Sequence, residues 1–170
     1  MREAMLSIRI AATDDADAVA RVLLASYSSL YRGWYQDDVL AAALPAMTRA
    51  NPRLLSSGRY FVAEIDGVIV ACGGWSAEKP GGAMIPRLAH VRHFATDPDF
   101  INRGCGGAIL TRSLEEAAAA GFAEIESVSS LTAEAFYARH GFRPVTMVRQ
   151  PMAGADFACV LMRRRLEGRI

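Results

Sequence analysis

A chain of 170 residues with 52% hydrophobic and 22% charged side chains has the composition of one globular domain, large enough to bury a core without staples. Its 19 basic and 18 acidic residues leave a net charge of +1, which excludes the basic surplus of a nucleic-acid binder and gives no attraction to a membrane surface. The three cysteines are too widely spaced for a disulfide framework or a zinc motif, so no metal is expected. Without an apolar leader segment, a cytoplasmic location is expected.

The first third of the chain predicts a strand followed by two helices. Polar and apolar residues alternate over residues 7–11, which predicts a strand. Apolar side chains at helical spacing predict a helix over residues 16–25, and a second helix from Asp37 to about Arg49 that Pro45 kinks or breaks. The stretch that interrupts the first helix is aromatic, with Tyr27, Tyr31, Trp34 and Tyr35.

The middle of the chain predicts a hairpin and a loop. Residues 60–65 and 68–75 have the composition of strands, and Asp66-Gly67 between them is a strong hairpin turn. Residues 78–86 are rich in glycine and proline and predict a loop.

The last part of the chain alternates strands and helices. A strand over residues 88–96 leads into a helix that ends near Gly121, and the later segments are a strand, a short helix and two strands at residues 124–128, 133–140, 142–148 and 157–163. The basic run at its end, residues 163–165, is expected to be a solvated strand end rather than a phosphate patch. The order of elements is mixed α/β and differs from a regular βαβ repeat.

A glycine-rich turn at residues 103–107 lies between a predicted strand and a predicted helix. A helix N-terminus presents free N–H groups and partial positive charge, and glycines let the backbone approach an anion closely. The turn is therefore a candidate pyrophosphate cradle, although it matches neither a Walker loop nor a dinucleotide fingerprint. Tight helix–strand packing is an equally good explanation of the glycines taken alone.

Two segments in order carry a family resemblance. Residues 96–110, TDPDFINRGCGGAIL, resemble motif A of the GCN5-related N-acetyltransferase (GNAT) superfamily, and residues 133–142, AEAFYARHGF, resemble its motif B. The sequence departs from the family pattern at three positions, where Ile101 replaces Gln or Arg, Thr96 replaces Val and Ser130 replaces Asn.

The resemblance implies a single α/β domain over residues 1–170, with a central mixed twisted sheet of about seven strands, about four helices, and splayed fourth and fifth strands. It implies acetyl-CoA as the acyl donor and an amine on a small molecule or peptide as the acceptor. A homodimer is also implied, because relatives are often dimers. The implied coenzyme A contacts are Phe94, Ala95, Thr96, Asn102, Arg103, Gly104, Cys105, Gly106, Gly107 and Ser130.

By the same resemblance, His90 is the candidate general base and Tyr137 the acid that protonates the leaving thiolate. A histidine titrates near neutrality, which suits proton removal from an amine. His93 and Glu126 are weaker base candidates, and water could carry the proton instead. Strand alternation predicts that His90, Arg92 and Phe94 share one face of the strand, with His93 on the other.

Cys105 and the aromatic residues leave alternatives open. A thiol at a helix N-terminus should have a lowered pKa, but Cys105 occupies a variable motif position, so a passive thiol is favoured over a nucleophile. The aromatic stretch is expected either to form the acceptor wall or simply to pack under a loop. At the level of function, a direct-attack N-acyltransferase is favoured over a non-catalytic coenzyme A sensor and over an unrelated phosphate-binding domain.

Overall fold

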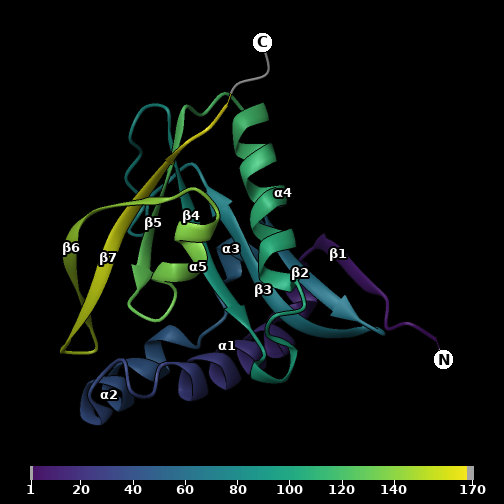
Figure 1. The fold of residues 1–170 in the computed structure, drawn as a ribbon, viewed down its shortest axis with the longest axis horizontal. Coiled ribbons are helices and arrows are strands. Elements are labelled where there is room, and N and C mark those ends of the chain that lie inside the picture. Colours follow the sequence, from purple (N-terminus) through teal and green to yellow (C-terminus); the bar gives the residue numbers. More distant parts are fainter. Residues whose placement is uncertain (1, 168–170) are drawn as a thin grey trace.

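Seven strands form one mixed sheet in the order β1-β2-β3-β4-β5-β7-β6 in a computed structural model that describes residues 2–167 (Figure 1). The ends of the expected 1–170 domain, Met1 and residues 168–170, lie outside the described residues. The strands are β1 Leu6–Ile10, β2 Tyr60–Ile65, β3 Val68–Ser76, β4 Leu88–Thr96, β5 Glu124–Ser130, β6 Arg143–Met152 and β7 Ala155–Arg165. The helices are α1 Ala16–Leu30, α2 Asp37–Met47, α3 Pro52–Leu55, α4 Cys105–Ala119 and α5 Glu134–Arg139, with 3₁₀ turns η1 Thr13–Asp15 and η2 Pro98–Phe100.

Helices cover both faces of the sheet. The apolar stripe of α4, with Ile109 and Leu110, packs on one face together with Tyr137 of α5. On the other face, Val22 and Leu23 of α1 pack with Leu40 of α2. The predicted mixed α/β sheet of about seven strands is therefore confirmed, with five α-helices where about four were expected.

The fourth and fifth strands separate as expected. β4 and β5 pair in parallel only from Leu88 to His90, opposite Glu124 to Glu126. Beyond that point β5 keeps its antiparallel partner β7 as far as Ser130, while β4 continues alone beside β3. The backbone edges that face each other across this opening are free to line a cavity.

The structure differs from the helical predictions for residues 16–55 in three details. α1 continues to Leu30, because Tyr27 lies one turn after the buried Leu23 and extends the same apolar stripe. α2 is not broken at Pro45, which sits in its last turn, where a missing N–H removes one hydrogen bond. The short helix α3 was not predicted; Asn51 caps it by accepting hydrogen bonds from the N–H groups of Arg53 and Leu54.

The two C-terminal strands are longer than predicted. β6 and β7 form a hairpin paired from Arg143 to Met152, around a turn in which Ala153 and Gly154 have φ of 49° and 81°. Positive φ at both turn positions is typical of a type I′ hairpin, but Ala-Gly lacks the Asn or Asp that usually marks one. The Asp66-Gly67 hairpin, with φ of 50° and 79°, was predicted correctly for that reason.

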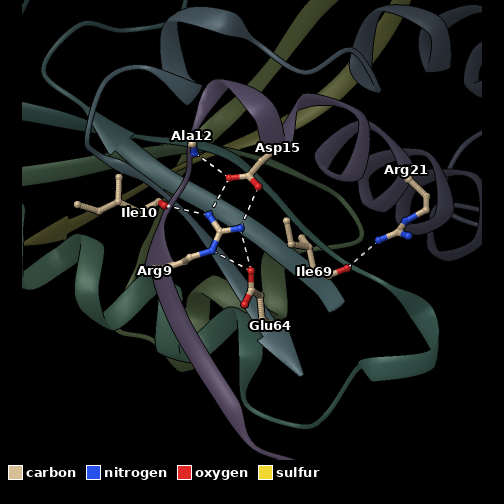
Figure 2. Close-up of polar contacts among 7 residues, drawn as sticks. All are labelled: Arg9, Ile10, Ala12, Asp15, Arg21, Glu64 and Ile69. Carbon is tan, nitrogen blue, oxygen red and sulfur yellow. Dashed lines mark hydrogen bonds and ion pairs between the residues drawn. The ribbon is translucent and has the colours of Figure 1, made fainter. Parts of the chain in front are cut away.

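Arg9 ties the edge strand β1 to its neighbours (Figure 2). Its guanidinium donates to Glu64 of β2 through Nε at 2.8 Å and to Asp15 of η1 through Nη1 and Nη2 at 2.8 and 2.9 Å. Asp15 also accepts a hydrogen bond from the N–H of Ala12 at 2.7 Å. These contacts fix the corner where the chain leaves the sheet for α1.

Candidate active site

A β-bulge interrupts β4 beside the opening in the sheet. Cys72 of β3 pairs with Ala95 and Gly74 pairs with Arg92, so His93 and Phe94 together oppose the single residue Gly73. His93 adopts the left-handed conformation at φ 53°, as the extra residue of a bulge can.

The bulge overturns the prediction that Phe94 shares a face of β4 with His90 and Arg92 while His93 lies on the other face. One inserted residue reverses the side-chain alternation, so His93 lies on the α1 face, where its Nε2 bonds the Met47 carbonyl at 2.7 Å. Phe94 turns to the α4 face and meets the ring of Tyr137 edge-on at 6.4 Å. His90 and Arg92 precede the bulge and pair beside Ser76 and Gly74.

Two buried tyrosines donate hydrogen bonds to the backbone of the bulge. The Tyr60 hydroxyl donates to the His93 carbonyl at 2.7 Å, and the Tyr27 hydroxyl donates to the Phe94 carbonyl at 2.8 Å. The Phe94 ring lies over Gly73, where an added Cβ would come within 2.6 Å of it. The backbone at Phe94 is thus held on both faces of the sheet.

The glycine turn opens α4 as the sequence predicts. Gly104 is the N-cap residue, with φ 79°, and the N–H groups of the first helical turn follow it. A Cβ at Gly107 would meet His140 Nε2 at 3.2 Å, and one at Gly106 would meet the Phe136 ring at 3.4 Å. Both contacts are with side chains of α5 or its C-cap residue, so these two glycines allow α4 to pack closely against α5. The free N–H groups that begin α4 are the part of the turn that suits an anion.

Cys105 and Arg103 differ from the expectations for this turn. Cys105 is 2% exposed, and burial raises the pKa of its thiol despite the helix N-terminus and Arg103, so the predicted lowering was wrong. Desolvation of the thiolate outweighs the favourable partial charges. The Arg103 guanidinium lies 5.1 Å over the ring of Phe100 and does not line the cavity described next.

A cavity of about 910 Å³ runs along the opening between β4 and β5. It extends from the α4 turn past the bulge to the C-terminal end of α2 and the start of α3. With the exception of Arg103, the residues predicted for catalysis and coenzyme A binding line it, namely His90, Phe94, Ala95, Thr96, Asn102, Gly104, Cys105, Gly106, Gly107, Ser130 and Tyr137.

His90 is 3% exposed in this cavity, and its Nε2 has no hydrogen-bond partner among the described residues. Burial lowers the pKa of the imidazole, and the carboxylate of Glu126 opposes this only in part. A neutral imidazole with a free ring nitrogen can accept a proton. Glu126, the neighbouring base candidate, is instead engaged by Arg163 Nη2 at 2.8 Å.

Tyr137 lies across the opening from the bulge and is 5% exposed. Burial raises the pKa of its phenol well above the ordinary value, and the nearby Ser127 hydroxyl opposes this in part. The phenol is therefore protonated at neutral pH and can donate. Ser127 was not predicted as a site residue, although the alternation of β5 would have indicated its position in the cavity lining.

Other predicted residues divide between the cavity and the surface. Tyr27 and Tyr31 line the cavity, whereas Tyr35 stacks on Phe157 at 4.0 Å outside it and Trp34 is 56% exposed. The aromatic stretch as a whole does not form one wall. Ser130 accepts a hydrogen bond from the N–H of Ala133 at 3.2 Å and so supports the start of α5.

The predicted solvated strand end at residues 163–165 was wrong in part. Besides the Arg163–Glu126 pair, Arg164 Nη1 donates to the His140 carbonyl at 2.6 Å. Both contacts form because β7 runs beside β5 and α5, a tertiary arrangement that a local charge run does not reveal.

A sequence model described as "Acetyltransferase (GNAT) domain" matches residues 56–144, just over half of the chain. The chain belongs to the GNAT acetyltransferase family. The matched region contains the hairpin, the bulged strand, the glycine turn and Tyr137. A search of curated proteins finds no significant match.

Solved GNAT structures share the fold at low identity. A GCN5-related N-acetyltransferase from Rhodopseudomonas palustris has a TM-score of 0.81 and 21% identity, covering 98% of this chain and 99% of that one. The PaiA N-acetyltransferase of Thermoplasma acidophilum, solved with coenzyme A, has a TM-score of 0.71 and 15% identity over 95% and 99%. The Escherichia coli ribosomal-protein-S18-alanine N-acetyltransferase has a TM-score of 0.65 and 19% identity over 98% and 97%.

The described residues contain neither a metal-binding cluster nor a membrane-spanning helix. Over residues 2–167, no group of three or more His, Cys, Asp or Glu side chains is arranged to hold a metal ion. None of the helices in the same range is long and apolar enough to cross a membrane.

Proposed function

We propose that residues 1–170 form one acyl-CoA-dependent N-acyltransferase domain that transfers acetyl from acetyl-CoA to a primary amine. The observation that carries this proposal is the single cavity that joins the α4 turn, the β4 bulge, His90 and Tyr137. A coenzyme A complex of the PaiA relative supports the choice of donor. When bound, acetyl-CoA supplies an acetyl thioester.

The donor would lie along β4 with its pyrophosphate at the α4 turn. The first N–H groups of α4 hold the phosphates, and Phe94, Ala95 and Thr96 present their backbone to the pantetheine arm. Because Ile101 replaces a Gln or Arg, backbone amides carry more of this binding than in the family pattern. The N–H of Phe94 polarises the thioester carbonyl.

Two side chains would then transfer protons, one as a base and one as an acid. An amine with a pKa near 10 is mostly protonated at neutral pH, so it must lose a proton before it attacks. His90 accepts that proton at its free ring nitrogen, directly or through water. Tyr137, protonated because it is buried, donates to the departing thiolate. No covalent acyl-enzyme is formed, in keeping with the raised pKa of the Cys105 thiol.

Thermal-shift and thiol-release measurements test this function. Acetyl-CoA should raise the melting temperature where ATP and NAD do not, and free thiol should appear only when an amine is present. Tyr137→Phe should lower kcat by at least about tenfold, while acetyl-CoA affinity stays nearly unchanged.

The outcomes separate the proposal from its alternatives. Binding of acetyl-CoA without turnover on any class of amine would favour the coenzyme A sensor. Equal stabilisation by acetyl-CoA, ATP and NAD would exclude both the N-acyltransferase and the coenzyme A sensor. An unchanged kcat for Tyr137→Phe would exclude that residue as the acid.

A further inference from the structure

The end of the cavity away from the glycine turn carries unbalanced positive charge. Its positively charged lining residues are Arg49 and Arg92, whereas burial lowers the pKa of His90 and of His93 and keeps both imidazoles neutral near pH 7. Among the described residues that line the cavity, the one acidic side chain is Glu126, which is already paired with Arg163 at 2.8 Å. A polycationic acceptor such as a polyamine would find no free carboxylate here.

Arg92 is the charge closest to the proposed chemistry. It is half-buried on β4, two residues from His90 and next to the bulge. Its Nη1 donates to the Ser76 hydroxyl at 3.0 Å, and that hydroxyl donates in turn to the Glu78 carbonyl at 2.5 Å. No carboxylate lies within 4.0 Å of the guanidinium among residues 2–167. Burial lowers the pKa of the guanidinium, and the exposed Glu78 opposes this only in part.

A half-buried guanidinium held only by a neutral hydroxyl keeps most of its donors free of a charged acceptor. The same end of the cavity holds the buried, unpartnered Nε2 of His90. Arginine presents a planar fork that matches a carboxylate better than any other group a small acceptor carries. These two positions therefore fit an acceptor with both an amine and a carboxylate.

We propose that Arg92 binds the carboxylate of the acceptor, which makes the substrate an amino acid-like amine with an apolar side chain. The apolar part has a place, because Tyr27, Leu30, Met47 and Leu54 line the same end of the cavity. Arg49, exposed at the cavity mouth, adds attraction for an anion. This inference rests on the proposed N-acyltransferase function.

Four related amines test the inference in the thiol-release assay with acetyl-CoA: L-phenylalanine, L-phenylalaninamide, phenethylamine and spermidine. L-Phenylalanine should have a kcat/KM at least about tenfold above the other three, because only its carboxylate can accept a charged hydrogen bond from Arg92. A hydrogen bond of that kind contributes enough free energy for about a tenfold difference. Arg92→Met should raise the KM for L-phenylalanine at least about tenfold and leave the KM values for its amide and for acetyl-CoA unchanged. Arg92→Lys should restore part of the loss.

A matched control is Arg112→Met on α4, outside the cavity, whose partly exposed pair with Glu116 contributes little. Titration calorimetry of L-phenylalanine with the coenzyme A complex, for wild type and Arg92→Met, reports binding independently of turnover. Equal use of the amide and the acid, an equal loss with all amines in Arg92→Met, or no L-phenylalanine binding would overturn the inference. Turnover of amines without carboxylate preference would leave the proposed function standing.

Discussion

His90 connects burial to a measurable pH dependence. Its pKa is lowered below the ordinary 6.5, chiefly by burial, so the residue becomes an effective base as pH rises through that lowered value. We expect kcat/KM for the acceptor to show an acidic limb with a midpoint below 6.5, separate from the amine's own ionisation at higher pH. His90→Gln should remove this limb and lower kcat/KM about a hundredfold, as pH–rate profiles would show.

The control for His90→Gln is acetyl-CoA affinity, which should stay the same, since the residue lies away from the glycine turn. A variant that keeps the acidic limb would show that another group, or solvent, removes the proton.

At the residue scale, the sequence predicted which side chains line the cavity, but it did not predict how each of them is buried or paired. The glycine turn and Tyr137 belong to short motifs whose local geometry fixes their position. The pKa direction for Cys105 was wrong, because burial depends on packing by residues far away in the chain. The sequence likewise could not show that the Arg92 guanidinium lacks a carboxylate partner, because ion pairs form only in the folded chain.

At the element scale, the bulge in β4 is the feature that alternation could not predict. The adjacent Gly73 and Gly74 were the available signal, because glycine inside a strand often marks a bulge or a close approach. Gly74 shows such an approach, since a Cβ there would clash with the Arg59 carbonyl oxygen. Which strand carries the extra residue depends on pairing across the sheet, which a single strand's sequence does not contain.

Tyr60→Phe tests whether the bulge is held for function. Tyr60 is 1% exposed and lies outside the cavity lining, so its hydroxyl reaches the site through the His93 carbonyl. Removing it leaves that carbonyl with only the weak Cys72 thiol donor at 4.0 Å, which should cost about 1–3 kcal/mol of unfolding free energy. It should also lower kcat several-fold, because the left-handed His93 and the neighbouring Phe94 lose one constraint.

Tyr35→Phe is the control, because it removes a hydroxyl that donates to the Ala158 carbonyl at 2.7 Å and accepts from the Leu131 N–H at 2.8 Å, away from the bulge. Urea unfolding should show a loss of stability in both variants, at least as large in Tyr35→Phe, whereas kcat at a temperature where both are folded should fall only in Tyr60→Phe. An equal change in kcat would show that the Tyr60 hydrogen bond serves stability alone.

At the scale of the whole molecule, the layout of strands and helices was predictable because two motifs in order specify it. The opening between β4 and β5 follows from that layout, since β5 takes β7 as its antiparallel partner while β4 stays with β3 (Figure 1). The N-terminal part, with its missed α3, carries no such motif. Its arrangement depends instead on contacts such as the Arg9 cluster, which joins residues up to 55 positions apart.

The Arg9 cluster should make the stability of the molecule sensitive to acid. Hydrogen bonds from Arg9 lower the pKa of Asp15 below its ordinary value of 3.8. The group therefore stabilises the fold fully above pH 3.8, and this contribution is lost as pH falls through the lowered folded-state value. Arg9→Met should cost about 1–3 kcal/mol at pH 7 and flatten the fall in unfolding free energy below about pH 4.

Arg149→Met is the control, because its pair with Asp156 is 69% and 63% exposed and should change neither quantity measurably. Urea unfolding from pH 7 to pH 3 measures both effects, and an acid dependence in Arg9→Met as steep as in the wild type would show that other carboxylates dominate.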